Sequence, residues 1–198
     1  DDLVRLTLVR PVAFRVSTAQ EPSALRRIFA IMGMYPVSYY DLSQAGVPVH
    51  STAFRPTDDA ALCRNPFRIF TSLLRLELIE NVALRERAAE ILSRRNIFTP
   101  RCLELIDLHD AQGHFTEAQA REFVQEALET FRWHRHATVD QETYLALSNE
   151  HRLIADVVCF PGCHINHLTP RTLDIDRVQE LMPKYGIEPK MLIGAPAG

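Results

Sequence analysis

The segment His164–His167 carries two histidines three residues apart, the strongest metal-ligand pattern in the sequence. On a helix, two histidines at this spacing share a face and could chelate a metal ion. However, Pro161, Gly162 and Pro170 flank the segment and favour an extended backbone. On a strand, residues three apart point to opposite faces, so only one of the two could serve a given site. His167 is the candidate metal imidazole, and a hydrogen-bonded structural histidine is the alternative interpretation.

Two arginines end the similar triplets Ala13–Arg15 and Ala53–Arg55, both of which read Ala-Phe-Arg within β-rich sequence. In a strand, Ala and Arg of such a triplet share one face and Phe takes the other. A guanidinium group pairs with a carboxylate through two parallel hydrogen bonds, and its burial without an anion is costly. An inward-facing Arg15 or Arg55 would therefore indicate an acidic ligand, whereas on an open face both would be solvated. His50, five residues before Arg55, is expected on the opposite strand face.

Cys159 and Cys163 have three residues between them, which is neither the two-residue redox spacing nor half of a zinc knuckle. We interpret them as small buried apolar side chains, with a thiol or zinc site as the alternative. The four cysteines do not form the framework of a secreted disulfide-rich protein, which favours a cytoplasmic location. The sequence contains neither a glycine-rich phosphate loop nor a Gly-x-Ser-x-Gly nucleophile motif.

Overall composition argues against two further classes of protein. The 198 residues include 22 Lys and Arg against 25 Asp and Glu, a formal charge of −3, so no basic excess is present to bind nucleic acid. The apolar runs are short and interrupted by charges, so we expect no membrane span. The chain begins at Asp1 without Met, shows neither the charged n-region nor the apolar h-region of a signal peptide, and ends in Gly194–Gly198, which is expected to be flexible. We expect it to be part of a longer protein.

Residues 1–57 are predicted to be β-rich, with one helix between strands. The capping-box pattern Thr18–Glu21 begins this helix, and Gly33 ends it. Pro11 is expected to interrupt the first β-rich stretch because proline cannot donate a ladder hydrogen bond. The expected strands cover residues 3–9, 12–16, 37–41 and 47–55.

A helical insertion is predicted over residues 65–158, followed by a β/α return over 160–194. Asn65 and Pro66 are expected to begin a buried helix over Phe67–Ile79. Three later helices are expected over residues 84–98, 99–110 and 174–184. Another is expected to begin at the capping box Thr116–Gln119 and to carry Val124, Ala127, Leu128 and Phe131 on one face. A further helix is expected to begin at Asp140, with Leu147, Ile154 and Val158 in one stripe. Extended segments are expected over 163–169 and 190–193. The chain is thus predicted to be a single α+β domain over residues 1–198.

Four stretches carry a resemblance to a known family. Phe29–Pro36, Gly46–Arg55, Phe70–Arg75 and His164–Asp176 resemble the bacterial 2-oxoadipate dioxygenase/decarboxylase family, also called hydroxyglutarate synthase. The similarity runs from about residue 3 to residue 192 and covers less than half of a full-length family member. The resemblance implies a mixed β-sheet core like that of the vicinal-oxygen-chelate proteins, with large helical additions.

The resemblance also implies an iron(II) enzyme that converts the small-molecule substrate 2-oxoadipate and O2 to 2-hydroxyglutarate and CO2 in lysine catabolism. Two histidines and one carboxylate would bind Fe(II), and an arginine would pair with a substrate carboxylate. By this likeness, His167 corresponds to the second metal histidine and Arg15 to the substrate arginine. The first metal histidine corresponds to Pro11, which has no donor atom, and the carboxylate ligand would lie beyond residue 198. His50 and His164 are the possible substitutes.

Two hypotheses follow from this resemblance. The chain is either part of a metal-dependent 2-oxo acid dioxygenase or a truncated, non-catalytic relative that retains the fold and carboxylate binding at Arg15. Because Pro11 cannot bind iron and the carboxylate ligand lies beyond residue 198, two of the three protein ligands are missing, and we expect no turnover of 2-oxoadipate by the 198-residue chain itself. We also expect His167 to point into the concave face of the sheet, about 10 Å or less from Arg15, with His164 pointing away.

Overall fold

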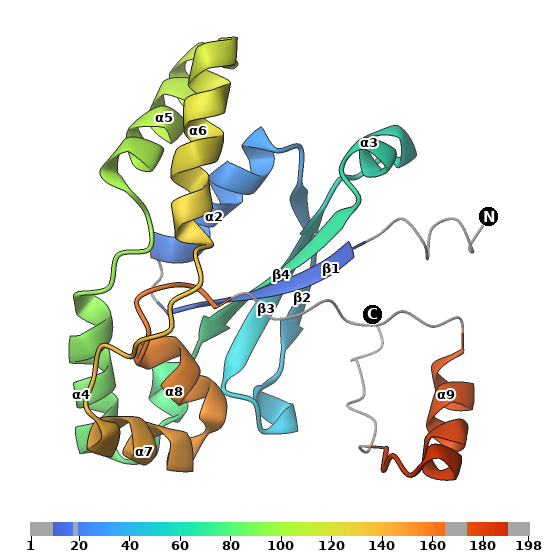
Figure 1. Ribbon diagram of the computed structural model, residues 1–198, viewed down its shortest axis with the longest axis vertical. Coiled ribbons are helices and arrows are strands. Elements are labelled where there is room, and N and C mark those ends of the chain that lie inside the picture. The colour runs from blue at the N-terminus through green and yellow to red at the C-terminus, as the bar shows by residue number, and fades with distance from the viewer. Residues whose placement is uncertain (1–9, 18–19, 165–173, 190–198) are drawn as a thin grey trace.

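The computed structural model describes residues 10–17, 20–164 and 174–189 and centres on one mixed β-sheet (Figure 1). The four strands are β1 (Arg10–Val16), β2 (Tyr35–Asp41), β3 (Val49–Arg55) and β4 (Phe67–Leu74), in the spatial order β1-β4-β3-β2. β1 runs parallel to β4, and the other two pairs are antiparallel. Helix α2 connects β1 to β2, as the sequence predicts.

Most of the helices lie between β4 and the last described segment, and their first residues follow the predicted caps. Thr99 caps α5, Asp140 caps α7, and Thr116 forms the predicted reciprocal capping box with Gln119 at the start of α6. None of the helices within the described residues is long and apolar enough to cross a membrane. The helices are α2 (Gln20–Ile31), α3 (Asp59–Arg64), α4 (Val82–Ser93), α5 (Pro100–Gln112), α6 (Glu117–Thr130), α7 (Gln141–Glu150), α8 (Arg152–Val158) and α9 (Ile175–Leu181), with short 3-10 turns at Ser43–Ala45, Leu76–Leu78 and Met182–Tyr185.

The larger core joins one face of the sheet to α2, α5 and α6. Phe14 and Phe54, the central residues of the two Ala-Phe-Arg triplets, are both buried in it. The ring of Phe29 from α2 lies 6.2 Å from the ring of Phe14 and 5.1 Å from that of Phe54. This arrangement confirms that the two phenylalanines share a face, and it leaves the arginines of the triplets on the other face.

Among the described residues, a second core covers one end of that other face. Val49 and Leu74, which are paired across β3 and β4, pack there against residues of α4, α7 and α8. Beyond this end, the face carries mostly polar and charged residues. We call it the polar face, and its members on the four strands include Arg15, Ser38, Tyr40, Ser51, Arg55, Arg68, Phe70 and Ser72.

The predicted buried helix over Phe67–Ile79 is wrong, because most of this segment forms the central strand β4. Its residues alternate in the manner of a strand, with Ile69 and Thr71 buried and Arg68 and Phe70 half-buried. β4 pairs with β1 on one side and with β3 on the other, so its backbone hydrogen bonds are satisfied within the sheet. A short apolar run has no periodicity that separates a buried strand from a buried helix, and the pairing partners decide the outcome here.

Pro11 lies inside β1 and does not interrupt it, contrary to prediction. β1 is an edge strand of the described sheet, with Pro11 paired to Arg68 on β4. Proline is tolerated at such a position because its missing N–H falls on the outer side of the edge.

Two helical predictions also require correction. On α6, Val124 and Leu128 are exposed, and Phe123 and Ala127 face the core, so the buried stripe is shifted by one residue. The helix predicted from Asp140 onward is two helices, α7 and α8, which meet at His151. The Nδ1 atom of His151 accepts a hydrogen bond from the backbone N–H of Leu153 and so caps α8.

Candidate functional site

A row of polar side chains crosses the polar face from one edge of the sheet to the other. Arg15 pairs with Ser72, Ser72 with Ser51, and Ser51 with Tyr40, one residue from each strand. Directly paired residues point to the same face of a sheet, so the four side chains lie side by side. The hydroxyl groups of Ser51 and Ser72 form a 2.6 Å hydrogen bond. The sheet therefore presents one guanidinium, two hydroxyls and one phenol along a single line, the polar row.

Asp156 on α8 holds the guanidinium group of Arg15 at the end of this row. The Nη1 atom of Arg15 donates a hydrogen bond to Oδ2 of Asp156, and the two groups form an ion pair. Only 19% of the Arg15 side chain is exposed, and its burial lowers the pKa of the guanidinium group. The contact uses one of the five N–H donors of arginine, so the others can pair with a ligand carboxylate.

His164 lies on the other side of Asp156 and is buried. Its Nδ1 atom and the Oδ1 atom of Asp156 are 2.7 Å apart, and 5% of its side chain is exposed. The imidazole ring stacks against Trp133, at 4.5 Å between ring centroids, and contacts Phe160 at 4.4 Å. The two aromatic rings and Asp156 together fix the orientation of His164, which in turn fixes the carboxylate that contacts Arg15.

Burial lowers the pKa of His164, and the charges of Arg15 and Arg95 lower it further, against an opposing effect of the His134 backbone. The folded protein therefore binds a proton at His164 less readily than the unfolded chain, in which the pKa is near the ordinary value of 6.5.

We expect the folded state to lose stability as the pH falls below about 6.5, because the unfolded state is protonated first. Above that pH the contribution of His164 is constant. A His164→Asn variant should lose this part of the pH dependence, as measured by urea unfolding between pH 7.5 and pH 5.5. The matched control is His114→Asn at an exposed position, which should keep the wild-type slope.

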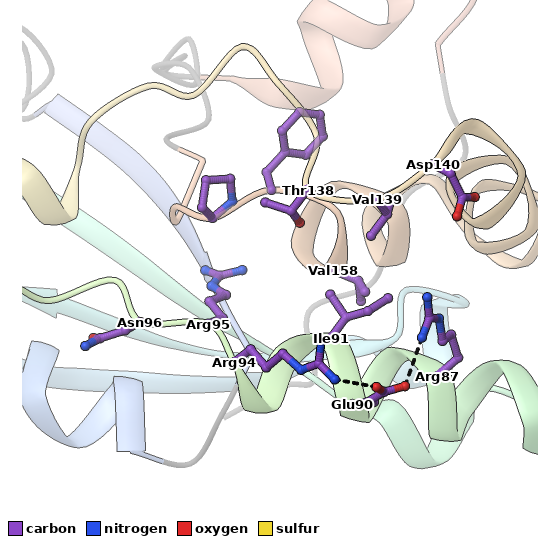
Figure 2. Close-up of a pocket in the computed structure, with 12 residues that line it drawn as sticks. Arg87, Glu90, Ile91, Arg94, Arg95, Asn96, Thr138, Val139, Asp140 and Val158 are labelled. Carbon is purple, nitrogen blue, oxygen red and sulfur yellow. Dashed lines mark hydrogen bonds and ion pairs between the residues drawn. The ribbon is translucent and has the colours of Figure 1, made fainter.

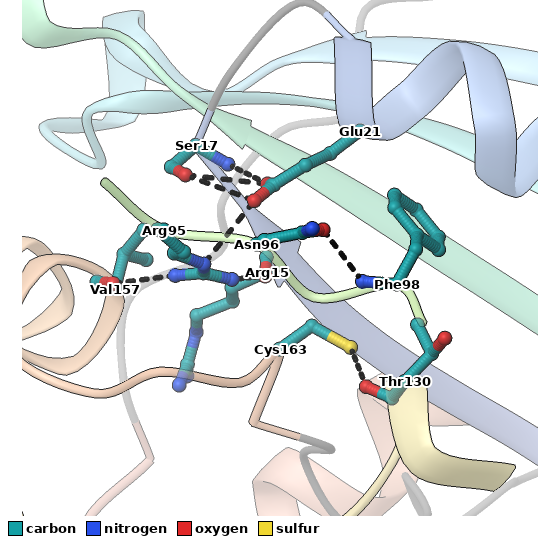
Figure 3. Close-up of polar contacts among 9 residues, drawn as sticks. All are labelled: Arg15, Ser17, Glu21, Arg95, Asn96, Phe98, Thr130, Val157 and Cys163. Carbon is teal, nitrogen blue, oxygen red and sulfur yellow. Dashed lines mark hydrogen bonds and ion pairs between the residues drawn. The ribbon is translucent and has the colours of Figure 1, made fainter. Parts of the chain in front are cut away.

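A second, deeper ion pair lies beneath Arg15 (Figure 3). Arg95 and Glu21 face each other with 3.2 Å between Nε and Oε1, and their side chains are only 3% and 5% exposed. Arg95 also donates hydrogen bonds to the backbone oxygens of Val157, at 2.6 Å, and Arg15, at 3.3 Å. Because Val157 follows Asp156, Arg95 ties β1 to α8 at the point where the Arg15 and Asp156 side chains meet.

Glu21 is the acidic residue of the first predicted capping box, and it does act at the start of α2. Its carboxylate accepts hydrogen bonds from the backbone N–H of Ser17, at 2.6 Å, and from the Ser17 hydroxyl. The predicted partner Thr18 lies outside the described residues. The contact with Arg95 gives Glu21 a second role that the sequence pattern does not reveal.

The structure brings together only some of the residues that the sequence indicates. Arg15 and His164 meet through Asp156, and His164 is buried beside Arg15 instead of pointing away from it. His50 pairs with Leu73, which packs in the core on the α2 side, so it lies on the opposite face from Arg15. His167 lies outside the described residues, so its orientation and its distance from Arg15 stay predictions.

The cysteines behave as the sequence interpretation expects. Cys159 and Cys163 are buried free thiols, and burial raises their pKa values to about 11 and about 12. The Sγ atom of Cys163 donates a hydrogen bond to the backbone oxygen of Thr130. Thiols held in the protonated form are poor nucleophiles and poor zinc ligands, which argues against the thiol or zinc alternative.

A separate surface hollow of about 450 Å³ lies between α4 and residues 138–140 (Figure 2). Its charges are largely paired, because Glu90 contacts both Arg87, at 2.9 Å, and Arg94, at 2.6 Å. None of the residues of the polar row lines it. The hollow therefore offers no continuation of the Arg15 site.

Asp156 is the functional residue that the sequence interpretation missed. It lies 141 residues from Arg15 in the chain, so no local pattern links the two. One signal was available, since Asp156 is the only acidic residue in α8, where Ile154, Ala155 and Val157 are buried. A lone carboxylate on a buried helix requires a partner of opposite charge, so Asp156 is expected to pair with a cation from elsewhere in the fold.

Comparison with known structures first defines the class of fold. A glyoxalase superfamily protein from Ralstonia eutropha JMP134 aligns with a TM-score of 0.65 at 20% identity, over 90% of this chain and 56% of that one. The fold is therefore α+β and of the vicinal-oxygen-chelate type, as the sequence predicts.

The sequence model of the 2-oxoadipate dioxygenase/decarboxylase family matches residues 1–198, and the chain belongs to this family. It is 76% identical over 196 residues to the Escherichia coli (strain K12) protein of that name, covering 99% of this chain and 44% of the relative. The structure of Pseudomonas putida hydroxyglutarate synthase in complex with 2-oxoadipate aligns with a TM-score of 0.81 at 59% identity, over 93% of this chain and 41% of that one. The chain thus spans less than half the length of these relatives.

Proposed function

We propose that this chain forms the substrate-binding part of an enzyme that converts 2-oxoadipate and O2 to 2-hydroxyglutarate and CO2. The observation that carries the proposal is Arg15, a largely buried arginine on the polar face whose guanidinium group is oriented by Asp156. A relative at 59% identity has been crystallised with 2-oxoadipate, which supports the choice of ligand. By the family resemblance, we propose that this reaction belongs to the breakdown of lysine, and the cysteine content favours a cytoplasmic location.

In this function Arg15 binds a substrate carboxylate through its remaining N–H donors. Charge-assisted hydrogen bonds in a partly buried setting are stronger than those between neutral groups, and a paired guanidinium fixes the plane of the carboxylate. Arg95 and His164 act indirectly, because they hold the backbone of Arg15 and the side chain of Asp156. The chain thereby restricts the substrate to one orientation before any bond changes.

The family resemblance implies an iron(II) ion, but the described residues do not form a site for it. Within those residues, no group of three or more His, Cys, Asp or Glu side chains is placed to hold a metal ion. Pro11, at the position implied for the first histidine, has no donor atom, and His50 lies on the wrong face. The proposed role of the described residues is therefore confined to binding and orienting the substrate.

A second candidate function is a non-catalytic relative that binds 2-oxo acids without converting them. Pro11 is the observation that favours it, because β1 places this residue on the polar face beside Arg68, where a histidine ligand would be needed. The two candidates share the binding site and differ only in turnover.

We expect the 198-residue chain to bind 2-oxoadipate without turning it over. Binding is measured by calorimetry, and turnover by oxygen uptake with iron(II), ascorbate and 2-oxoadipate. Pro11→His should not restore uptake, because a second histidine still leaves the ligand set short of a carboxylate.

Absence of binding would contradict the proposed function. Oxygen uptake that disappears in a His167→Ala variant would show that other residues of this chain complete the metal site. That result would establish catalysis by the chain and reject the non-catalytic candidate.

A further inference from the structure

The surface hollow between α4 and residues 138–140 has an excess of positive charge on its α4 side (Figure 2). Arg87 and Arg94 share the single carboxylate of Glu90, so this group of three side chains carries one positive charge. Each arginine donates one hydrogen bond to Glu90 and keeps further N–H donors for a ligand. The three side chains are between 48% and 77% exposed, so a molecule that enters the hollow can reach them.

Asp140 carries a negative charge on the opposite side of the hollow. Its Oδ1 atom accepts a hydrogen bond from the backbone N–H of Thr143, at 2.7 Å, and so caps α7. Hydrogen bonds from Thr143 lower the pKa of the Asp140 carboxyl group, and the charge of Arg87 lowers it further. The carboxylate is therefore ionised at neutral pH. Among the described residues it has no ion-pair partner, and its Oδ2 atom accepts no side-chain hydrogen bond.

An aliphatic surface lies between the two charged sides. Val158 is buried, and Ile91 and Val139 pack against the second core, so all three are held in place. Arg95 also borders the hollow, but Glu21 balances its charge. The volume of about 450 Å³ lies within the range of about 300–1,000 Å³ that is usual for small-molecule sites.

This distribution of charge selects against simple ions. An organic anion is attracted by the arginines of α4 but repelled by Asp140, and an organic cation has the opposite difficulty. A molecule with a carboxylate at one end and an ammonium group at the other is attracted by both sides. An aliphatic chain between its two ends would cover Ile91 and Val158 and remove their exposed apolar surface from water.

We propose that the hollow binds a linear ω-amino carboxylate. Its carboxylate pairs with Arg94 and Arg87, its ammonium group pairs with Asp140, and its methylene chain packs on the aliphatic surface between them. None of the residues of the polar row lines the hollow, so this site is independent of Arg15 and of the proposed function.

The experiment compares four ligands by calorimetric titration of the full chain. The first is 6-aminohexanoate, which has both charges. Hexanoate lacks the ammonium group, hexylamine lacks the carboxylate, and norleucine is an isomer of 6-aminohexanoate with its two charges on neighbouring carbons. The wild-type chain should bind 6-aminohexanoate about tenfold more tightly than hexanoate or hexylamine, because each of these loses one charged contact. Norleucine should also bind more weakly, because its two charges cannot reach both sides.

Two variants test the two charged contacts separately. Asp140→Asn keeps a good N-cap for α7 and removes the negative charge, so it should weaken 6-aminohexanoate binding about tenfold without weakening hexanoate binding. Arg94→Gln should weaken 6-aminohexanoate binding about fivefold, because Arg87 remains, and should not weaken hexylamine binding. The matched control is Arg121→Gln on α6. Arg121 is 76% exposed and pairs with Glu117 four residues before it, as Arg94 pairs with Glu90, and its loss should leave all affinities unchanged.

Equal binding of 6-aminohexanoate and hexanoate by the wild-type chain would overturn the inference, and so would wild-type affinity for 6-aminohexanoate in Asp140→Asn. Norleucine that binds as tightly as 6-aminohexanoate would reject the arrangement with one charge on each side. Arg15→Gln should bind 6-aminohexanoate as the wild type does. Weaker binding by this variant would place the ligand on the polar face and reject the hollow as its site.

Discussion

A Glu21→Ala variant should lose about 3–5 kcal/mol of its free energy of unfolding, because it leaves the charge of Arg95 buried without a counter-ion. Arg95 is almost fully enclosed, and Glu21 is the only carboxylate paired with it in the described part of the chain. The substitution also removes the acceptor for the Ser17 backbone N–H. The effect is measured by urea unfolding monitored by circular dichroism.

The matched control is Glu122→Ala, which breaks an ion pair of the same type on the surface. Arg101 and Glu122 are 2.8 Å apart, but both side chains are more than 40% exposed. Exposed pairs contribute up to about 1 kcal/mol, so this variant should be nearly as stable as the wild type. A similar loss in both variants would show that the buried pair has no special role. If Glu21→Ala does not fold, the double variant Glu21→Leu/Arg95→Met should recover the fold, because it leaves no unpaired charge.

The parts of the fold that the sequence predicts are those with a local physical signal. The β3 segment follows the turn signal Ser43–Gly46, where the structure has a 3-10 turn that ends at Gly46, and its strand assignment is confirmed. Thr116 and Gln119 satisfy each other's backbone donors within one turn, so no distant contact is needed to start α6. The sequence of β4 predicts a helix incorrectly, because a run that is apolar on most sides fits either a helix or a strand. Pairing with its two neighbouring strands, which lie elsewhere in the chain, determines that this segment forms a strand.

The same distinction applies to the candidate site, where features set by a local pattern are predictable and features set by distant contacts are not. The strand face of Arg15 is predicted correctly, because strand alternation puts it opposite Phe14, which is buried. The pairing of Asp156 with Arg15 could not be predicted, because Arg15 is brought to it only when α8 packs over the end of the sheet. Strand alternation predicts that His164 points away from the site, but no strand is present at Cys163 or His164 in the described residues. Its orientation follows from stacking on Trp133 instead.

An Arg15→Gln variant should bind 2-oxoadipate about a hundredfold more weakly than the wild-type chain. Glutamine can offer a single neutral N–H to a carboxylate, whereas the guanidinium group offers two charged ones. The loss of charged hydrogen bonds corresponds to about 3 kcal/mol, and each 1.4 kcal/mol changes the dissociation constant roughly tenfold. The dissociation constant is measured by calorimetric titration of the full chain.

The choice of control follows from the contacts of Asp156. Asp156→Asn leaves Arg15 in place but removes the negative charge that orients it, so this variant should bind 2-oxoadipate less tightly than the wild type and more tightly than Arg15→Gln. Arg15→Gln should lose much less stability than Glu21→Ala, because Asp156 is 27% exposed and keeps its contact with His164, and because the Arg95 hydrogen bond is to the backbone oxygen of residue 15. Unchanged affinity in Arg15→Gln would refute the role of the guanidinium group. An equal loss of stability and affinity would instead assign Arg15 to the fold, since a residue that acts on the ligand changes binding alone.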